Sequence, residues 1–163
     1  RGTPPATKGT EFEAPFGMAP GANTGYGLMK RRHMYEFGTP QEQFAKMAVN
    51  QRFNALTNPN AVFHDQPITV DHVLTSRLVN DPLHLLECVM PCAGACIVTS
   101  SERAKTLPNP PVYILGAAAG VSGHDTIWQA DRITTSPVVI SARKALEMSG
   151  YSPKDIEFAE FYD

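Results

Sequence analysis

The sequence lacks the features that would place it in a membrane-spanning or nucleic-acid-binding class. No uninterrupted apolar run approaches the roughly eighteen residues of a membrane-spanning helix. Its 14 basic and 16 acidic residues give a formal net charge of -2, which excludes the strong basic bias of a dedicated nucleic-acid-binding protein. No hydrophobic signal core follows Arg1. We therefore expect no nucleic-acid partner and no membrane span.

Cysteine is scarce and odd in number, with three residues in a chain of 163. A disulfide framework uses paired cysteines in an oxidising compartment, so this set fits a reducing one better. We expect a cytoplasmic protein, with an organelle matrix as the alternative. The remaining composition, 42% hydrophobic and 18% charged, is typical of a globular domain with a sizeable core.

Two helices are expected in the first half of the chain. Over residues 21–37, apolar and basic residues interleave with a helical period, and Gly38 is expected to end this helix as its cap. Thr39, Pro40 and Glu42 have the spacing of an N-cap, a first-turn proline and a capping box. A second helix should therefore start here and finish near residue 58.

Further along the chain, hydroxyl residues mark the expected starts of shorter helices. These caps are Thr69, Ser100 or Ser101, Ser136 before Pro137, and Ser152 before Pro153. Three apolar runs, at 95–99, 112–115 and 156–162, are expected to be strands, the first of them buried. The last two flank a helix that should end at Gly150, which predicts a right-handed parallel crossover.

Four potential soft metal ligands recur at every fourth position of one segment. They are His84, Cys88, Cys92 and Cys96. A tetrahedral zinc site needs such ligands to converge, but Pro91 and Gly94 interrupt any helix through the run, and Cys96 falls in an apolar run. We therefore expect no metal. Cys92, on a turn of small residues, is a candidate nucleophile, although packing as a small apolar side chain is favoured.

Small residues follow the apolar run at 112–115. The glycines of segment 116–123 do not have the spacing of a dinucleotide-binding turn, so we expect them to allow a close crossing of strands. His124 comes just after them, in an expected loop, and is a candidate acid or base. A surface histidine without such a role is the favoured alternative.

A compact basic cluster lies within the first predicted helix. It consists of Lys30, Arg31, Arg32 and His33. Arginine side chains match phosphate oxygens, so Arg31, Arg32 and His33 are candidates for binding the phosphates of a nucleotide-like cofactor. The alternative, a solvated helix face without a ligand, is favoured by how common such runs are.

The last two residues, Tyr162 and Asp163, follow the final predicted strand. Catalytic and ligand-binding groups collect at the carboxyl ends of strands in open α/β sheets. A phenol there can act as an acid or base, and a neighbouring carboxylate can orient it. Because no further residue follows, we expect this chain to be a piece cut through an active site.

The chain resembles the thiolase superfamily, in particular thiolases of the lipid-transfer-protein or sterol-carrier-protein type. The residues that carry the resemblance occur in order along the chain: 12–17 (FEAPFG), 31–39 (RRHMYEFGT), 81–88 (DPLHLLEC), 94–99 (GACIVT), 142–150 (ARKALEMSG) and 161–163 (FYD).

This resemblance implies an α/β fold that covers part of a thiolase. The implied order is an irregular lead-in at 1–17, a helical loop domain on the coenzyme A side at 18–93, and the end of the N-terminal half at 94–108. Residues 109–163 would then form the truncated start of the C-terminal half. Thiolases are considerably longer, and their nucleophilic cysteine belongs before Arg1.

Tyr162-Asp163 stands where classical thiolases have Asn-Glu-Ala-Phe and sterol-carrier types have His-Asp. Tyrosine there resembles the enzymes that act as retro-aldolases on steroid side-chain thioesters, often with an OB-fold partner. The implied catalytic residues are Tyr162, Asp163 as its orienter and His124 as an accessory. At residues 90–94 this chain has MPCAG, where relatives usually carry Ser or Asn with Asp before the glycine.

We therefore expect part of an enzyme that makes or breaks carbon–carbon bonds in acyl-CoA thioesters, with retro-aldol cleavage favoured. Coenzyme A enters as the substrate thioester, and no covalently bound cofactor is expected. The alternatives are a β-ketoacyl-CoA thiolase and a non-catalytic binding or assembly subunit. We expect a homodimer of the full-length protein. The 163 residues alone should contact further chain or self-associate, because half a sheet exposes apolar edges.

Overall fold

The computed structural model describes residues 22–88, 96–121 and 130–161. The expected lead-in at 1–17 lies outside this part. By its internal contacts the chain divides into two compact units. The first comprises Arg1–Pro91 with His124–Thr134, and the second Cys92–Gly123 with Thr135–Asp163. Each is described below by itself.

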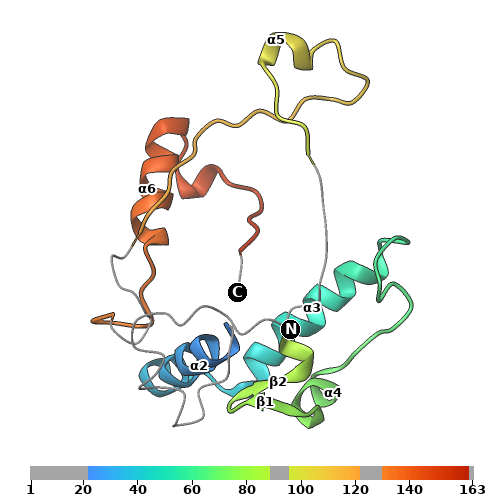
Figure 1. The fold of residues 1–163 in the computed structure, drawn as a ribbon, viewed down its shortest axis with the longest axis vertical. Helices are drawn as coiled ribbons and strands as arrows, with labels where there is room; N and C mark the ends of the chain where they lie inside the picture. Colours follow the sequence, from blue (N-terminus) through green and yellow to red (C-terminus); the bar gives the residue numbers. More distant parts are fainter. Residues whose placement is uncertain (1–21, 89–95, 122–129, 162–163) are drawn as a thin grey trace, which may run out of the picture. The chain divides into compact units, whose positions relative to one another are not determined.

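Helix α2, Asn23–Phe37, opens the described part of the first unit (Figure 1). It ends at Gly38, whose φ of 66° lies in the left-handed region and whose N–H donates to the Met34 carbonyl at 2.9 Å. Glycine adopts this conformation at little cost because it has no Cβ. The predicted helix and its glycine cap are confirmed.

Helix α3, Gln41–Leu56, starts close to the predicted place but in a different manner. Its N-cap is Pro40, in an extended conformation with ψ of 158°, and no side chain caps the helix. The expected capping box of Thr39 and Glu42 is therefore wrong. Because Pro40 is itself the residue at the boundary, Thr39 falls one position outside the cap.

A short helix and a small sheet complete the described part of the first unit. Helix α4, Val70–Thr75, is capped by Thr69 as predicted. Thr69 Oγ1 accepts from the His72 N–H, and His72 Nδ1 accepts from the Thr69 N–H, both at 3.2 Å. Strands β1, Leu78–Asn80, and β2, Leu83–His84, pair antiparallel and lead into the single-turn helix η2, Leu85–Glu87. A cis peptide bond joins Asp81 to Pro82.

The core of this unit lies between α3 and α4. Ala45 on α3 and Val73 on α4 are both fully buried, and the two helices are in contact. Helix α2 contacts both strands of the hairpin, and α3 contacts η2. Helix α2 is therefore held against the hairpin, while α3 and α4 enclose the buried apolar side chains.

The second unit contains α5, Ser101–Ala104, α6, Val138–Ser149, and the single turn η4, Pro153–Asp155 (Figure 1). Ser100 caps α5 as one of the two predicted candidates, and α6 ends at Gly150 with φ of 74°, as predicted. The cap of α6 is Pro137 rather than Ser136, although the Ser136 hydroxyl accepts from the Val138 N–H at 3.1 Å.

None of the three strands predicted in this unit forms within its described residues. Residues 96–99, 112–115 and 156–161 have no regular structure, and Ile97, Val112 and Phe158 are 88%, 95% and 81% exposed. A strand requires a neighbour to satisfy its backbone groups, and no described segment pairs with these runs. The expectations of a buried strand at 95–99 and of a parallel crossover are therefore wrong for the described residues. The described sheet is the antiparallel pair β1–β2, in a mixed helix and sheet structure.

Within the described residues, no helix combines the length and the apolar character required to cross a bilayer.

Candidate functional site

The three candidate catalytic residues, Tyr162, Asp163 and His124, lie outside the described residues. The candidate nucleophile Cys92 does as well. The basic cluster on α2 is described in full, so the candidate site is built from that helix and from the groups that surround it.

Lys30 points into the core and is not part of a solvated face. Its side chain is 6% exposed and forms an ion pair with Glu87, which is 7% exposed. Its ammonium also donates to the Pro82 carbonyl at 3.1 Å and lies 4.9 Å from the centre of the Phe44 ring. A buried cation is tolerated when a carboxylate and further acceptors surround it. Lys30 therefore fastens α2 to the hairpin and η2.

Arg31 is exposed and pairs with Asp81, at the turn between β1 and β2. The two side chains are 55% and 67% exposed. An exposed ion pair contributes only about 0–1 kcal/mol, because water screens both charges. The guanidinium can therefore exchange this carboxylate for another anion at little cost.

Arg32 belongs to a second and larger cluster around Glu36. Its Nε donates to Glu36 Oε1 at 2.7 Å, and its guanidinium lies 5.5 Å from the centre of the Tyr35 ring. The other carboxylate oxygen accepts from Thr134 Oγ1 at 2.8 Å and lies 3.5 Å from Arg132 Nη2. The hydrogen bond from Thr134, followed by that from Arg32, lowers the pKa of the Glu36 carboxyl.

His33 faces the same side of α2 as Lys30. Its ring lies 4.6 Å from the Phe37 ring and 5.6 Å from the Phe44 ring, between centres. Its buried Nδ1 has no hydrogen-bond partner among the described residues. The four cluster residues are thus divided, with Lys30 and His33 directed inward and Arg31 and Arg32 outward.

The hairpin holds α2 in this orientation through Asn80 and Pro82. Asn80 Nδ2 donates to the carbonyls of Asn23 and Thr24, at 3.3 and 3.4 Å. A Cβ added to the buried Gly27 would lie 2.6 Å from the same nitrogen, so the close approach of Asn80 requires glycine there. Gln41 Nε2 also donates to the Pro82 carbonyl at 2.6 Å.

The soft-ligand run does not assemble into a site within the described residues. His84 Nδ1 lies 2.7 Å from the Ser76 carbonyl, and Cys88 Sγ donates to the His84 carbonyl at 3.5 Å. Desolvation by burial, and then the charge of Glu87, raise the pKa of the Cys88 thiol, which disfavours the thiolate. Cys96, expected in a buried strand, is exposed. No group of three or more potential ligands is found in the described segments.

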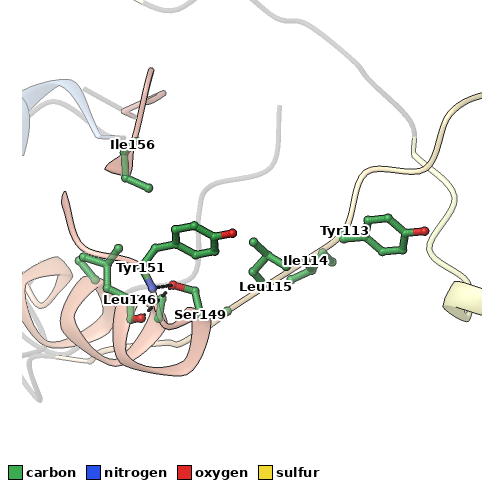
Figure 2. A pocket seen from close by; sticks show the side chains of 10 residues that line it. Tyr113, Ile114, Leu115, Leu146, Ser149, Tyr151 and Ile156 are labelled. Atoms are coloured by element: carbon green, nitrogen blue, oxygen red, sulfur yellow. Dashed lines mark hydrogen bonds between the residues drawn. The ribbon is translucent and has the colours of Figure 1, made fainter. Parts of the chain in front are cut away.

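An open apolar groove of about 460 Å³ lies within the second unit, between segment 113–116 and α6. Figure 2 shows Leu146, Tyr151 and Ile156 on one side and Ile114 and Leu115 on the other. Among its lining residues there is no carboxylate, imidazole or cationic side chain. The groove is mainly apolar, and the polar side chains in its lining are the phenols of Tyr113 and Tyr151 and the hydroxyl of Ser149.

Glycine allows the chain to approach α6 closely at this groove. A Cβ on Gly116 would collide with the Ala145 carbonyl, and one on Gly120 would lie 2.6 Å from the Pro137 carbonyl. The small residues after 112–115 do allow a close approach, but to helix α6 and its N-cap, so the expected crossing of strands is wrong.

Similarity to individual known proteins identifies the family of the chain, although none of the protein-family models matches it. Over 156 residues it is 40% identical to the "Steroid side-chain-cleaving aldolase" of Thermomonospora curvata. The alignment covers 91% of this chain and 39% of that protein. Over 141 residues it is 38% identical to an "Acetyl-CoA acetyltransferase" of Methanothermobacter thermautotrophicus, covering 85% and 36%. The chain belongs to the thiolase-like proteins. It therefore spans less than half the length of these relatives.

A solved structure supports the relationship of this thiolase-like chain in three dimensions. The structure is named "Ltp2-ChsH2(DUF35) aldolase" and matches with a TM-score of 0.78 and 32% sequence identity, over 96% of this chain and 43% of that one. The resemblance to thiolases and to the related steroid side-chain aldolases is thereby confirmed.

Sequence reasoning missed Glu36, Arg132 and Thr134. The Arg32–Glu36 pair has the i, i+4 spacing of a helical ion pair and was available as a signal. The bond between Glu36 and Thr134 spans 98 positions of the chain, and no local pattern marks it.

Proposed function

We propose that this thiolase-like chain is part of an enzyme that makes or breaks carbon–carbon bonds in acyl-CoA thioesters, with retro-aldol cleavage of a lipid or steroid side chain as its reaction. The observation that carries the proposal is the 40% identity to a steroid side-chain-cleaving aldolase over 91% of this chain. The structural match to an aldolase at a TM-score of 0.78 supports it further.

In the proposed reaction, Tyr162 acts as the general base. It removes the proton of the β-hydroxyl group, the bond between the α and β carbons breaks, and the β carbon becomes a carbonyl. The electron pair of the broken bond forms a thioester enolate, which is then protonated at the α carbon. Asp163 would orient the phenol, and His124 would assist the proton transfers.

Arg31 and Arg32 are proposed to bind the phosphates of the coenzyme A portion. Both guanidiniums are more than half exposed on the outer side of α2. An incoming phosphate can replace the exposed Asp81 as the partner of Arg31, and it can draw Arg32 away from Glu36, which keeps its contacts with Thr134 and Arg132. His33, the third predicted candidate, faces the inner side of the helix, where its ring packs against Phe37 and Phe44, so the proposed phosphate site consists of Arg31 and Arg32.

We also propose that the chain is a partial thiolase fold. Residues 18–93 would be the helical loop domain, 94–108 the end of the N-terminal half and 109–163 the start of the C-terminal half. The full protein would be a homodimer, with an OB-fold protein as a further subunit. The paired names in "Ltp2-ChsH2(DUF35) aldolase" support an assembly of two kinds of subunit.

Thiolysis of β-ketoacyl-CoA is the second candidate function. The 38% identity to an acetyl-CoA acetyltransferase favours it. The two reactions differ in what they consume, because retro-aldol cleavage needs no second thiol, whereas thiolysis requires free coenzyme A.

The test is product analysis with the intact protein on two substrates. A β-hydroxyacyl-CoA with a branched or steroid side chain should yield a ketone or aldehyde and a shortened acyl-CoA without free coenzyme A. Cleavage only of a β-ketoacyl-CoA, and only with added coenzyme A, would overturn the aldolase assignment in favour of thiolysis. Binding of both substrates without cleavage would instead support the non-catalytic subunit.

A further inference from the structure

Glu36 is the point at which residues distant in the chain meet helix α2. Its Oε1 accepts from Arg32 at 2.7 Å, and its Oε2 accepts from Thr134 Oγ1 at 2.8 Å and pairs with Arg132 Nη2 at 3.5 Å. One carboxylate thus joins α2 to a segment 98 positions further along the chain.

The surroundings of Glu36 favour a lasting contact over a chance surface pair. The Glu36 side chain is only 15% exposed, whereas the Arg32 and Arg132 side chains are 52% and 60% exposed. Both carboxylate oxygens are engaged, by two cations and a hydroxyl. A network of charges with shared hydrogen bonds contributes more than an isolated surface pair.

The place of this contact along the chain gives it a role. Residues His124–Thr134 group with the first unit, and the chain passes to the second unit at Thr135. Glu36 therefore holds the last residues that belong with the helical unit, immediately before the chain continues toward α6.

We propose, building on the acyl-CoA function above, that Glu36 is a positioning residue that fastens segment 130–134 to α2. The contact thereby fixes segment 130–134 beside the helix that carries the phosphate-binding arginines. When Arg32 turns to a substrate phosphate, Thr134 and Arg132 still hold Glu36, so the attachment persists in the substrate complex.

Limited proteolysis of the intact protein tests the attachment without any activity measurement. Trypsin cleaves after arginine, and the guanidinium of Arg132 is engaged by Glu36. Glu36→Ala should therefore raise the rate of cleavage after Arg132 about tenfold, the scale of one charge-assisted hydrogen bond, relative to cleavage after Arg143 on α6. Thr134→Val should raise it less.

The matched control is Glu42→Gln, which removes an exposed carboxylate from the first turn of α3. This variant should leave the ratio of cleavage after Arg132 to cleavage after Arg143 unchanged. Glu36→Asp should be cleaved after Arg132 more slowly than Glu36→Ala, because it keeps a carboxylate. Equal ratios in wild type, Glu36→Ala and Thr134→Val would overturn the attachment. Thr134→Val leaves α2 untouched, so the test holds even if Glu36→Ala does not fold.

Kinetics separate a positioning role from a purely structural one. Glu36→Gln should lower kcat for acyl-CoA cleavage with little change in KM, because the phosphate-binding arginines remain. An unchanged kcat together with faster cleavage after Arg132 would overturn the positioning role. A wild type that cleaves no acyl-CoA would overturn the proposed function itself, while the proteolysis would still decide the attachment.

The attachment should not titrate near neutral pH. The pKa of Glu36 is lowered, so its stabilising effect is complete above the ordinary glutamate value of about 4.3 and is lost only as the pH falls through the depressed value. Arg32 and Arg132 are the charged groups that face it, from α2 and from segment 130–134. The cleavage ratio should therefore be constant between about pH 6.5 and 8.5, where a histidine-dependent contact would change.

Discussion

At the scale of single residues, Arg31 and Arg32 are the described side chains that carry the proposed substrate binding. Replacing each by glutamine should raise the KM for an acyl-CoA substrate about tenfold, since a solvent-screened, charge-assisted contact is lost. The KM for the matching acyl-pantetheine thioester, which has no nucleotide phosphates, should not change. Steady-state kinetics on both thioesters provide the measurement.

The control for this substitution is Arg143→Gln, because Arg143 is an exposed arginine on α6. It should leave both KM values as in the wild type. An equal rise in KM for both thioesters in the Arg31 and Arg32 variants would show that these residues affect folding or binding of the acyl part, and not phosphate binding.

Lys30, in contrast to the two arginines, is a buried cation that stabilises the fold. Lys30→Met should destabilise the protein by about 3–5 kcal/mol, because Glu87 would be left buried without its counter-charge. Lys30→Met with Glu87→Gln should recover much of the loss, since the amide is neutral and can still accept from the His84 N–H. Urea denaturation of the single and double variants measures both values, and a double variant as unstable as the sum would contradict this account.

The basic cluster also shows what a sequence can and cannot predict at this scale. The types of its residues indicated phosphate binding, but the helical period directs Lys30 and His33 inward while Arg31 and Arg32 remain outside. Charge counting treats the four residues as one surface. The division depends on where the hairpin packs against α2, which only the tertiary structure provides.

At the scale of elements, the contact between α2 and the hairpin depends on Gly27. Gly27→Ala would gain about 1 kcal/mol of helix propensity but would push the Asn80 amide from the carbonyls that it contacts. We expect a net effect near zero. In an Asn80→Ala background, the same Gly27→Ala change should stabilise by about 1 kcal/mol, because the obstructing amide is gone.

Thermal or urea unfolding of the four proteins in this cycle gives the coupling between the two positions. Additive effects of the Gly27 and Asn80 substitutions would show that the close approach between them does not constrain α2.

Local signals predicted the ends of helices better than the strands. Gly38, Gly150 and Thr69 were identified from the residues alone, because a left-handed glycine or a capping hydroxyl acts over only a few positions. The box expected at Thr39 failed because Pro40 itself occupies the cap. The runs at 95–99, 112–115 and 156–162 have strand-like composition, but strand formation depends on neighbours that composition does not provide.

At the scale of the whole molecule, the second unit leaves many apolar side chains uncovered. Val112, Phe158 and Phe161 are 95%, 81% and 79% exposed. The 163 residues expressed alone should therefore self-associate and bind a hydrophobic dye, unless further chain covers these side chains. Size-exclusion chromatography with light scattering at several concentrations measures this, and a stable, dye-negative monomer would contradict the expectation.

The long-range features of the molecule were beyond the reach of the sequence. The Glu36 cluster joins α2 to Thr134 across 98 positions, and the Lys30–Glu87 ion pair joins α2 to η2 across 57. Neither contact is marked by a periodic pattern in the sequence. The family, by contrast, could be identified from ordered segments along nearly the whole chain, and the relatives confirm it.

The most direct test of the central claim is the effect of Tyr162→Phe on cleavage of a β-hydroxyacyl-CoA by the intact protein. Loss of the general base should lower kcat about 10²- to 10⁴-fold. The control Tyr113→Phe, which removes a phenol from the second unit at a position without a proposed catalytic role, should retain the wild-type rate. A Tyr162→Phe variant that cleaves the substrate as fast as the wild type would contradict the proposed mechanism.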